Sequence, residues 1–420
     1  MHLDLHARHA DTNYGHKANT IVGNCVHCGF CTAACPTYRL SGNELESPRG
    51  RIYLIKEILE SGTVGAATQK HLDSCLTCRA CEPACPSGVE FGYLMEIGQK
   101  LASEQRPSSK LHRAVRRVIF AILTRPKLFS IMLGLGRLMQ PVLPIRVARH
   151  IPPQPIVGPR AEYAVKPSFS RRVILLEGCV QPALLPNVNA ATRRVLAHLG
   201  IEAVTAAGAG CCGALRLHGG DQERGLDDAR RNIDCWWPIV ESGAEAIVMT
   251  ASGCGVTVRD YGRVLRDDAV YATRAARLSE LTRDLCEIVS ENIGRIRIET
   301  KPRPRIAFHA PCTLQHGQRL GGKVEALLTA LGAEILPIAD ANQCCGSSGT
   351  YSFKYPSTAS ELRARKLQAL TRNSPDVILS ANVGCITHLA GGATSPVMHW
   401  VEWLDRWIEA SPEQGVERES

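Results

Sequence analysis

A pattern of four cysteines followed by proline occurs twice near the start of the chain, and it constrains the fold more than any other feature. The first copy, CVHCGFCTAACP, runs from Cys25 to Pro36, and the second, CLTCRACEPACP, runs from Cys75 to Pro86. Both have the spacing C-x2-C-x2-C-x3-C-P, which is typical of loops that bind [4Fe–4S] clusters. Soft thiolates suit tetrahedral iron. Three closely spaced thiolates bind three corners of one cube, and the cysteine before the proline ligates the other cluster when two loops are present.

The spacing therefore predicts two cubane clusters that exchange their last ligands. The predicted ligands are Cys25, Cys28, Cys31 and Cys85 for cluster 1, and Cys75, Cys78, Cys81 and Cys35 for cluster 2. A pair of structural zinc sites is the alternative, but zinc loops usually carry two CxxC pairs rather than three evenly spaced cysteines and a Cys-Pro. Because two adjacent clusters are suited to passing single electrons, these eight thiols indicate a short electron-transfer chain.

The cysteine content predicts the redox environment of the chain. There are 18 cysteines in 420 residues, and most occur in tight CxxC and CC groups rather than at spacings suited to long-range disulfides. A chain of this length does not need disulfides to fold, so we expect a reducing compartment and metal-bound thiolates. Residues 1–17 contain no apolar stretch, so we expect no signal peptide. We expect the histidines of this region, His2, His6, His9 and His16, to lie in a mobile tail.

The net charge of +9 is concentrated in one segment. Residues 106–172 contain 14 Lys and Arg and a single acid, Glu162, so they carry +13 while the rest of the chain sums to −4. Such local basicity indicates one anionic contact surface rather than binding to nucleic acid. Apolar residues interleave the charges, which favours a proline-rich docking segment at 106–170, for lipid head groups or an acidic subunit, over a solvated linker. The longest apolar run, Leu128 to Gly136, is too short to span a membrane.

The remainder of the chain is an internal repeat, with halves at residues 171–300 and 301–420. Each half has the form C-x31-CC-G-x(38–40)-C, and the cysteines of the two halves are offset by 133, 133, 133 and 131 residues. Four cysteines repeated in register indicate a shared site rather than separate buried thiols. The repeated cysteines are Cys179, Cys211, Cys212 and Cys254 in the first half, and Cys312, Cys344, Cys345 and Cys385 in the second.

Periodicity within each half predicts a strand, helix, strand, helix, strand order. In the first half the strands are expected at 173–178, 201–206 and 245–251, and the helices at 187–200 and 222–237. The cysteines follow the strands, and ligand sites in such folds lie at the carboxyl ends of the strands. We therefore predict an α+β multidomain protein. An α-helical ferredoxin-like domain (1–105), with a helix from Pro48 to Gly62 between its two loops, precedes a duplicated α/β domain with parallel strands.

The chemistry of the repeated cysteines stays open. Adjacent cysteines do not readily bind one tetrahedral metal together, but they can straddle a larger iron–sulfur cluster, form a thiol/disulfide redox pair or contribute to a zinc site. Cys235 and Cys286 have no counterpart in the repeat and are expected to be buried apolar residues. Five histidines lie near cysteines, and we expect each to be a hydrogen-bonding neighbour rather than a ligand: His27, His218, His309, His316 and His388.

Specific motifs for nucleotide or flavin binding are not evident in the sequence. There is no Walker loop and no nucleophile elbow, and the G-x-G-x-x-G at Gly208 to Gly213 contains the adjacent cysteines Cys211 and Cys212. The chain is therefore expected to receive its electrons from another subunit.

Several segments resemble one family closely. They include SPRGRIYLIKEILE, LEGCVQPALLPNVNAATRRVL, ARRNIDCWWP, TASGCGV, CTLQHGQ, CCGSSGTY and ANVGCITHL, together with both cysteine loops. Over essentially its full length the chain resembles the iron–sulfur subunits of bacterial glycolate oxidase (glycolate dehydrogenase). The resemblance implies a complex in which separate FAD-binding subunits oxidise glycolate to glyoxylate. This subunit, which does not itself bind the hydroxyacid, would pass the electrons towards a membrane quinone at the cytoplasmic face of the inner membrane.

The two halves resemble the cysteine-rich CCG domains of heterodisulfide reductases, lactate-utilisation proteins and the anaerobic glycerol-3-phosphate dehydrogenase small subunit. Alternative functions are therefore a subunit of a lactate or glycerol-3-phosphate dehydrogenase, or a thiol/disulfide enzyme of the heterodisulfide reductase type. The fuller family motif ends in CxxC, whereas here Thr257 and His388 stand at the last position. Each half thus lacks one thiolate of the five-cysteine cluster, and zinc, a modified cluster or no metal stay open.

Overall fold

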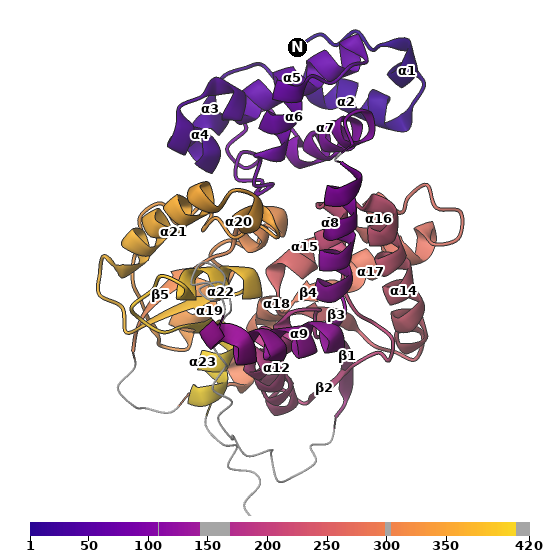
Figure 1. Cartoon of the computed structure of the whole chain (residues 1–420). Helices are drawn as coiled ribbons and strands as arrows, with labels where there is room; N and C mark the ends of the chain where they lie inside the picture. The colour runs from indigo at the N-terminus through magenta and orange to yellow at the C-terminus, as the bar shows by residue number, and fades with distance from the viewer. Residues whose placement is uncertain (108, 143–168, 299–303, 409–420) are drawn as a thin grey trace, which may run out of the picture.

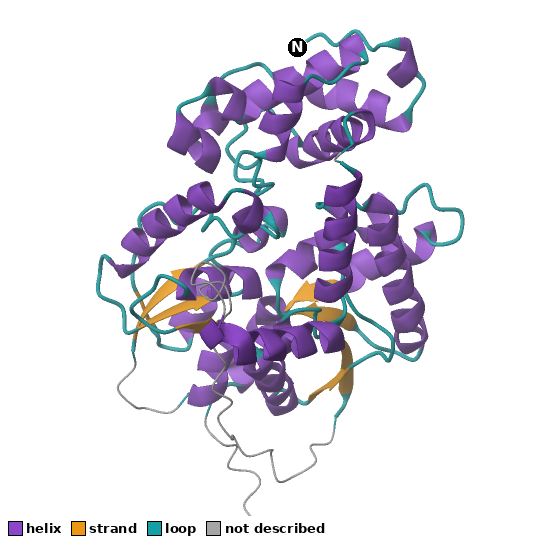
Figure 2. Ribbon diagram, viewed as in Figure 1, coloured by secondary structure: helices purple, strands orange, loops and turns teal. Residues whose placement is uncertain are grey.

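The computed structural model describes residues 1–107, 109–142, 169–298 and 304–408. Figure 1 shows a helical N-terminal layer that lies over two separate α/β units. Figure 2 shows strands in the two α/β units and none in the N-terminal layer, within the described residues. The predicted α+β architecture is confirmed. The proline-rich residues 143–168 of the basic segment lie outside the described residues.

The N-terminal domain is made of short helices around the two cysteine loops. The predicted helix between the loops is α5 (Pro48–Ser61), in which the Ser47 side chain accepts a hydrogen bond from Gly50 N and left-handed Gly62 ends the helix. Its apolar face, which includes Ile55 and Ile58, is fully buried against the domain core. The other helices are α1 (Ala7–Ala10), α2 (Asn13–Gly23), α3 (Phe30–Ala34), α4 (Pro36–Ser41), α6 (Ala66–Asp73) and α7 (Phe91–Gln105).

The prediction of a mobile N-terminal tail is wrong. Leu3 and His9 are buried, and the terminal amine donates to the carbonyl of Cys25 at 3.0 Å. The ring of His9 bonds the hydroxyl of Tyr14 at 2.9 Å. Residues that look polar and aperiodic in sequence are ordered here because single apolar or histidine side chains fill gaps beside α2 and α5.

The basic segment begins with two helices joined by a sharp bend, α8 (Lys110–Leu123) and α9 (Pro126–Met139). Phe120 and Leu133 are buried and anchor the two helices, while much of their remaining apolar surface is exposed. No single helix among the described residues is long and apolar enough to cross a membrane. Taken together, α8 and α9 have the length and apolar composition of a membrane-spanning segment, but the pair is bent by 101°.

The first half of the repeat is a four-stranded parallel sheet with strand order β2-β1-β3-β4. The register pairs Val173 of β1 with Ala203 of β2 and Ala246 of β3. The three predicted strands are present, and a fourth, β4, is added at one edge. The elements are β1 (Arg171–Leu176), α11 (Gln181–Leu184), α12 (Pro186–His198), β2 (Ile201–Val204), α13 (Ala214–Leu217), α14 (Gln222–Glu241), β3 (Ala246–Met249), α15 (Ser252–Arg259), α16 (Tyr261–Val264), α17 (Ala272–Leu281), β4 (Thr282–Asp284) and α18 (Leu285–Glu291).

The second half repeats this topology with strand order β6-β5-β7-β8, again all parallel. A short π-helical turn, Thr313–Gly317, follows its first strand. The duplication predicted from the cysteine spacing is therefore a duplication of the whole sheet. The elements are β5 (Arg305–His309), α19 (Lys323–Ala330), β6 (Glu334–Ile335), α20 (Tyr351–Lys354), α21 (Pro356–Thr371), β7 (Val377–Ser380), α22 (Val383–Ala390), β8 (Val397–His399) and α23 (Trp400–Trp407).

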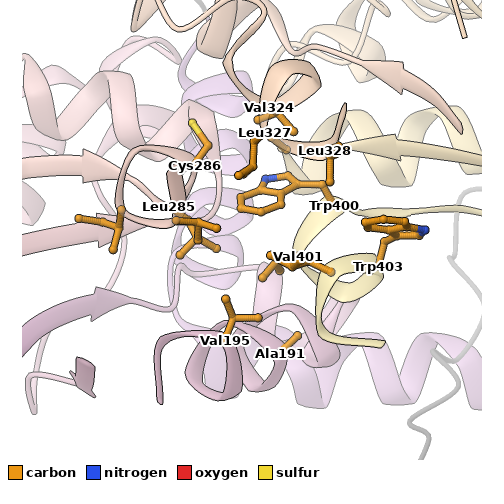
Figure 3. Close-up of a cluster of buried hydrophobic side chains, with 14 of the residues drawn as sticks. Ala191, Val195, Leu285, Cys286, Val324, Leu327, Leu328, Trp400, Val401 and Trp403 are labelled. Atoms are coloured by element: carbon orange, nitrogen blue, oxygen red, sulfur yellow. The ribbon is translucent and has the colours of Figure 1, made fainter. Parts of the chain in front are cut away.

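The two halves share one hydrophobic core, in which the helix after the first strand of each half meets the last helix of the other (Figure 3). Val195 of α12 lies near Val401 of α23, and Leu285 of α18 faces the α19 side chains. Trp400 lies in the centre of this contact and is fully buried. An ion pair between Arg194 and Asp405 at 2.8 Å joins α12 to α23. The shared core holds the two carboxyl edges in fixed positions.

Candidate metal centres

The two N-terminal cysteine loops have the same backbone conformation. His27 and Gly29 in the first loop, and the matching Thr77 and Arg79 in the second, all have positive φ angles. Non-glycine residues adopt this conformation rarely and at a cost, and such residues concentrate at functional sites. Arg79 is held there by ion pairs to Glu96 and to Asp260 of the first half. The repeated left-handed turns wrap each loop around the space that its thiols surround.

The thiols predicted for cluster 1 line one pocket. Its wall also contains apolar side chains such as Ile52 and Phe91. Burial raises the pKa of the Cys31 thiol to about 11, and the nearby Cys25 and Cys85 contribute to the same shift. Cys28 is exposed to solvent, so this site lies near the molecular surface. The pocket is lined by all four predicted ligands of cluster 1, Cys25, Cys28, Cys31 and Cys85, and also by Cys81, a predicted ligand of cluster 2.

The thiols predicted for cluster 2 also lie together, in a more buried place. Burial raises the pKa of the Cys81 thiol well above its usual value, and its charged neighbours Cys78, Cys75 and Cys35 raise it further. The structure thus brings Cys35 of the first loop to the thiols of the second, and Cys85 of the second loop to those of the first.

A buried arginine lies beside the cluster 2 thiols. Arg51 is 1% exposed, and its guanidinium donates to the carbonyl of His71 at 2.9 Å and to the Thr37 hydroxyl at 3.1 Å. Burial opposes its charge, but the nearby thiolates of Cys75 and Cys35 outweigh burial and raise its pKa. Arg51 also forms an ion pair with the Glu46 carboxylate at 2.5 Å. Its guanidinium still lowers the pKa of the Cys75 thiol against the effect of burial, which favours the thiolate form that metal binding requires.

The cysteine pairs of the two halves lie on matching turns. Gly213 and Gly346 follow the pairs, with φ angles of 89° and 90°. Each donates its backbone N–H to the first sulfur of its pair, Cys211 or Cys344, at 3.4 Å. A Cβ on Gly213 would lie 2.5 Å from the carbonyl oxygen of Gly225. The CCG motif therefore needs its glycine for both conformation and space.

The four thiols of each half lie next to one another at the carboxyl edge of the sheet. In the first half the neighbouring thiols of Cys179 and Cys212 lower the pKa of Cys211 well below its usual value, and Cys254 is a neighbour of Cys212. In the second half the same order runs through Cys312, Cys344, Cys345 and Cys385. The expectation that the repeat gathers four thiols per half at one sheet edge agrees with this arrangement.

The residues at the missing CxxC position do not replace the lost thiolate. Thr257 donates its hydroxyl to the carbonyl of Gly253 at 3.0 Å, and the His388 ring bonds the carbonyl of Ala359 at 3.2 Å. His316 bonds the carbonyl of Asn342 at 3.2 Å. His388 and His316 are hydrogen-bonding neighbours, as predicted. His309 is different: it has no such bond within the described residues and lies beside two thiols.

The second half lies directly against the cluster 2 loop. Cys312 lies close enough to Cys78 to raise the pKa of the Cys78 thiol beyond the effect of burial, and Cys78 in turn raises the pKa of the Cys344 thiol. Ser348 donates to the carbonyl of Leu76 at 2.7 Å, and Leu76 packs in an apolar cluster with Cys344. Cys286 is fully buried in the shared core, as predicted, whereas Cys235 is only partly buried, so the prediction for Cys235 is wrong.

Comparison with known proteins agrees with this layout. The model of the 4Fe-4S dicluster domain matches residues 21–89, and that of the cysteine-rich domain matches 173–259 and 306–390. The glycolate oxidase iron–sulfur subunit of Escherichia coli (strain K12) is 46% identical over 394 residues, which cover 94% of this chain and 96% of that protein. The chain belongs to the family of glycolate oxidase iron–sulfur subunits.

More distant relatives fall into two groups. The probable glycolate oxidase iron–sulfur subunit of Bacillus subtilis (strain 168) is 28% identical, with 88% of each chain covered. Lactate utilization protein A of Exiguobacterium sp. is 28% identical over 247 residues, which cover 98% of that protein but 56% of this chain. Relatives of the glycolate oxidase family thus share the full domain arrangement, whereas the lactate-utilisation relative is shorter.

Proposed function

We propose that this chain is the electron-transfer subunit of a glycolate-oxidising complex. It would take electrons from FAD-binding partner subunits, which convert glycolate to glyoxylate, and deliver them towards a membrane quinone. The observation that carries the proposal is the gathering of eight thiols into two sets, each completed by a cysteine from the opposite loop. Family membership supports the same role.

The donor set fits two [4Fe–4S] clusters. Soft thiolates, left-handed turns that free backbone N–H groups, and apolar walls are the features that such clusters need. Thr77 N already donates to Cys75 Sγ at 3.4 Å. A bound cluster would supply a one-electron acceptor and donor with a potential set by charge, hydrogen bonds and exposure. In this chain Arg51 supplies a charge at cluster 2, and the backbone N–H groups supply the hydrogen bonds.

The surface around Cys28 suits contact with the flavin subunits. Val26 is 68% exposed and Phe30 is 65% exposed, and they flank the exposed thiol of Cys28. Exposed aromatic and apolar side chains around a polar site are typical of protein interfaces. We therefore assign the electron-donating partner to this face, with cluster 1 nearest to it.

The helices α8 and α9 suit a lipid surface. Leu111 and Val115 on α8, and Ile131 and Leu135 on α9, are exposed at helical spacing, and basic residues such as Arg117 lie among them. Apolar side chains that insert between head groups, with cations that bind anionic lipids, are the features of interfacial helices. This pair is proposed as the peripheral contact with the cytoplasmic face of the inner membrane.

A reconstituted complex tests the proposal. Wild-type chain plus flavin subunits should couple glycolate oxidation to reduction of a quinone analogue, and Cys78→Ser should abolish that coupling. Cys235→Ser, at a cysteine outside the predicted sites, is the matched control and should leave it unchanged. Unimpaired quinone reduction by Cys78→Ser would remove the electron-transfer role. Faster turnover with lactate or glycerol 3-phosphate than with glycolate would reassign the substrate.

A further inference from the structure

The histidine at the end of β5 is buried without the hydrogen bonds that a histidine normally makes. His309 is 2% exposed, and neither of its ring nitrogens has a hydrogen-bond partner within the described residues. Leaving a buried polar group unpaired is costly, and such a group in a native structure calls for an explanation such as a bound ion. The backbone around it is fixed, because Ser380 of β7 donates its hydroxyl to the His309 carbonyl at 2.8 Å.

Two thiols complete a close group with this ring. One ring nitrogen of His309 and the Sγ atoms of Cys345 and Cys385 all lie within 4.8 Å of one another, and all three residues are buried. Donors bound to a single zinc ion lie roughly 3.5 Å apart, given bonds of about 2.0–2.3 Å and tetrahedral angles. Within the described residues, no three of the eight N-terminal thiols gather this closely. Wider spacing is expected of sulfurs that bind separate corners of a cube.

The three residues come from three parts of the second half. His309 ends β5, Cys345 lies on the CCG turn after β6, and Cys385 lies in the first turn of α22. Asn382 donates its side-chain amide to Cys385 Sγ at 3.5 Å, which orients that sulfur. The group is therefore held by the sheet edge itself rather than by a separate loop.

Among the described residues of the first half there is no equivalent group. The residue aligned with His309 by the repeat offset is Leu176, the last residue of β1, and it packs in an apolar cluster with Cys212. A nitrogen donor has therefore been placed in one half at a position that the other half uses for core packing.

The charges around the group favour a divalent cation. Two buried thiolates without a counterion would be costly. Lys366 is 4% exposed, but its ammonium is directed to the carbonyls of Asp340 and Ala341 at 2.9 and 3.2 Å. Zinc binds imidazole and thiolate donors, and one such ion would neutralise both thiolates and satisfy the ring.

We infer that His309, Cys345 and Cys385 form a zinc site in the second half, with a fourth coordination position left to water or to the adjacent Cys344. The site does not depend on the proposed electron-transfer function. It distinguishes the second half, with mixed nitrogen and sulfur donors, from the all-thiol series of the first.

Zinc content and X-ray absorption of the full chain, purified anaerobically, test the site. Wild-type chain should hold one zinc per chain, with sulfur neighbours at about 2.3 Å and an imidazole nitrogen at about 2.0 Å. His309→Leu, which copies Leu176, should weaken zinc retention against a chelator by at least tenfold and remove the imidazole signal. His309→Cys should restore retention with sulfur neighbours alone. His316→Ala, at a nearby histidine outside the group, should change neither.

The N-terminal clusters serve as the internal control for folding, since their iron content should be the same in all variants. Three results would overturn the site: no zinc in wild type, an unchanged imidazole signal in His309→Leu, or iron and sulfide in the second half instead of zinc. Each is separable from failure of electron transfer, because none requires an activity assay.

Discussion

The two halves of the duplicated domain share a sheet order, a CCG turn and a four-thiol series, yet their surroundings differ. In the first half the strand before the site ends in Leu176, whereas in the second it ends in His309. The second half lies against Cys78 and Leu76 of the ferredoxin-like domain. The first half contacts that domain through ion pairs, such as Arg263 with Glu96 at 2.8 Å. The two halves have therefore kept the same sheet and the same four cysteines. Their cysteine sites differ in the residue that ends the preceding strand, Leu176 or His309, and in how each half contacts the ferredoxin-like domain.

The largest expected difference between the halves is in metal retention. Cys345→Ser should remove the zinc from the second half, because it deletes one of three protein ligands. Cys212→Ser, the matching change in the first half, should leave the zinc count unchanged. Zinc per chain after gel filtration measures both. Equal losses from the two variants would mean that the halves hold the same kind of site.

The shared core should make the halves cooperate. Trp400→Ala removes a fully buried side chain between them and should lower the free energy of unfolding by about 3–5 kcal/mol. Trp236 is equally buried, but within the core of the first half. Hydrogen exchange should therefore rise in both β1 and β5 for Trp400→Ala, and only in the first half for Trp236→Ala. Rises confined to the second half for Trp400→Ala would contradict a shared core.

The last helix of each half is capped by a different titratable group, so the halves should respond oppositely to acid. Burial lowers the pKa of His399 to about 4, and its neutral ring bonds the Thr250 carbonyl at 2.9 Å and Val401 N at 3.1 Å. In the unfolded chain the His399 ring takes up a proton below about pH 6.5, whereas in the folded chain it does so only near pH 4. Stability from His399 is thus present at neutral pH and is lost as pH falls, by roughly 3 kcal/mol in total.

In the first half the capping residue is Asp284, whose pKa is raised by burial, so protonation favours its folded state and the sign is reversed. His399→Asn keeps a capping side chain but does not titrate. Urea unfolding at pH 6.5, 5.5 and 4.5 should show a shallower loss of stability for this variant. Parallel curves for variant and wild type would show that His399 does not carry the acid sensitivity.

Much of this comparison was predictable from sequence, because the repeat spacing and the strand periodicity are strong signals. The short strands β4 and β8 were not predicted, since three residues carry no detectable period. The left-handed conformation of Arg79 was also missed, as no glycine marks it. His309 was expected to be a hydrogen-bonding neighbour. Its approach to Cys385 depends on how α22 packs beside β7, the strand that pairs with β5, and no local pattern encodes that packing.

The smallest expected effects concern the CCG glycines. Gly346→Ala forces an alanine into the left-handed conformation, which should lower the free energy of unfolding by roughly 1–2 kcal/mol. It also places a Cβ atom 2.8 Å from the Ala359 carbonyl oxygen. Gly349→Ala is the control in the same half, because its φ is also positive but no atom lies within 4 Å. Gly213→Ala and Gly243→Ala form the same pair in the first half. Thermal unfolding should rank each CCG variant below its control, and equal losses within a pair would show that close packing of the turn does not matter.

Iron and acid-labile sulfide, counted per chain in anaerobically purified protein, test the central claim most directly. Two four-iron centres predict about eight of each per chain. A colourless protein without inorganic sulfide would contradict the account, whatever zinc it contained.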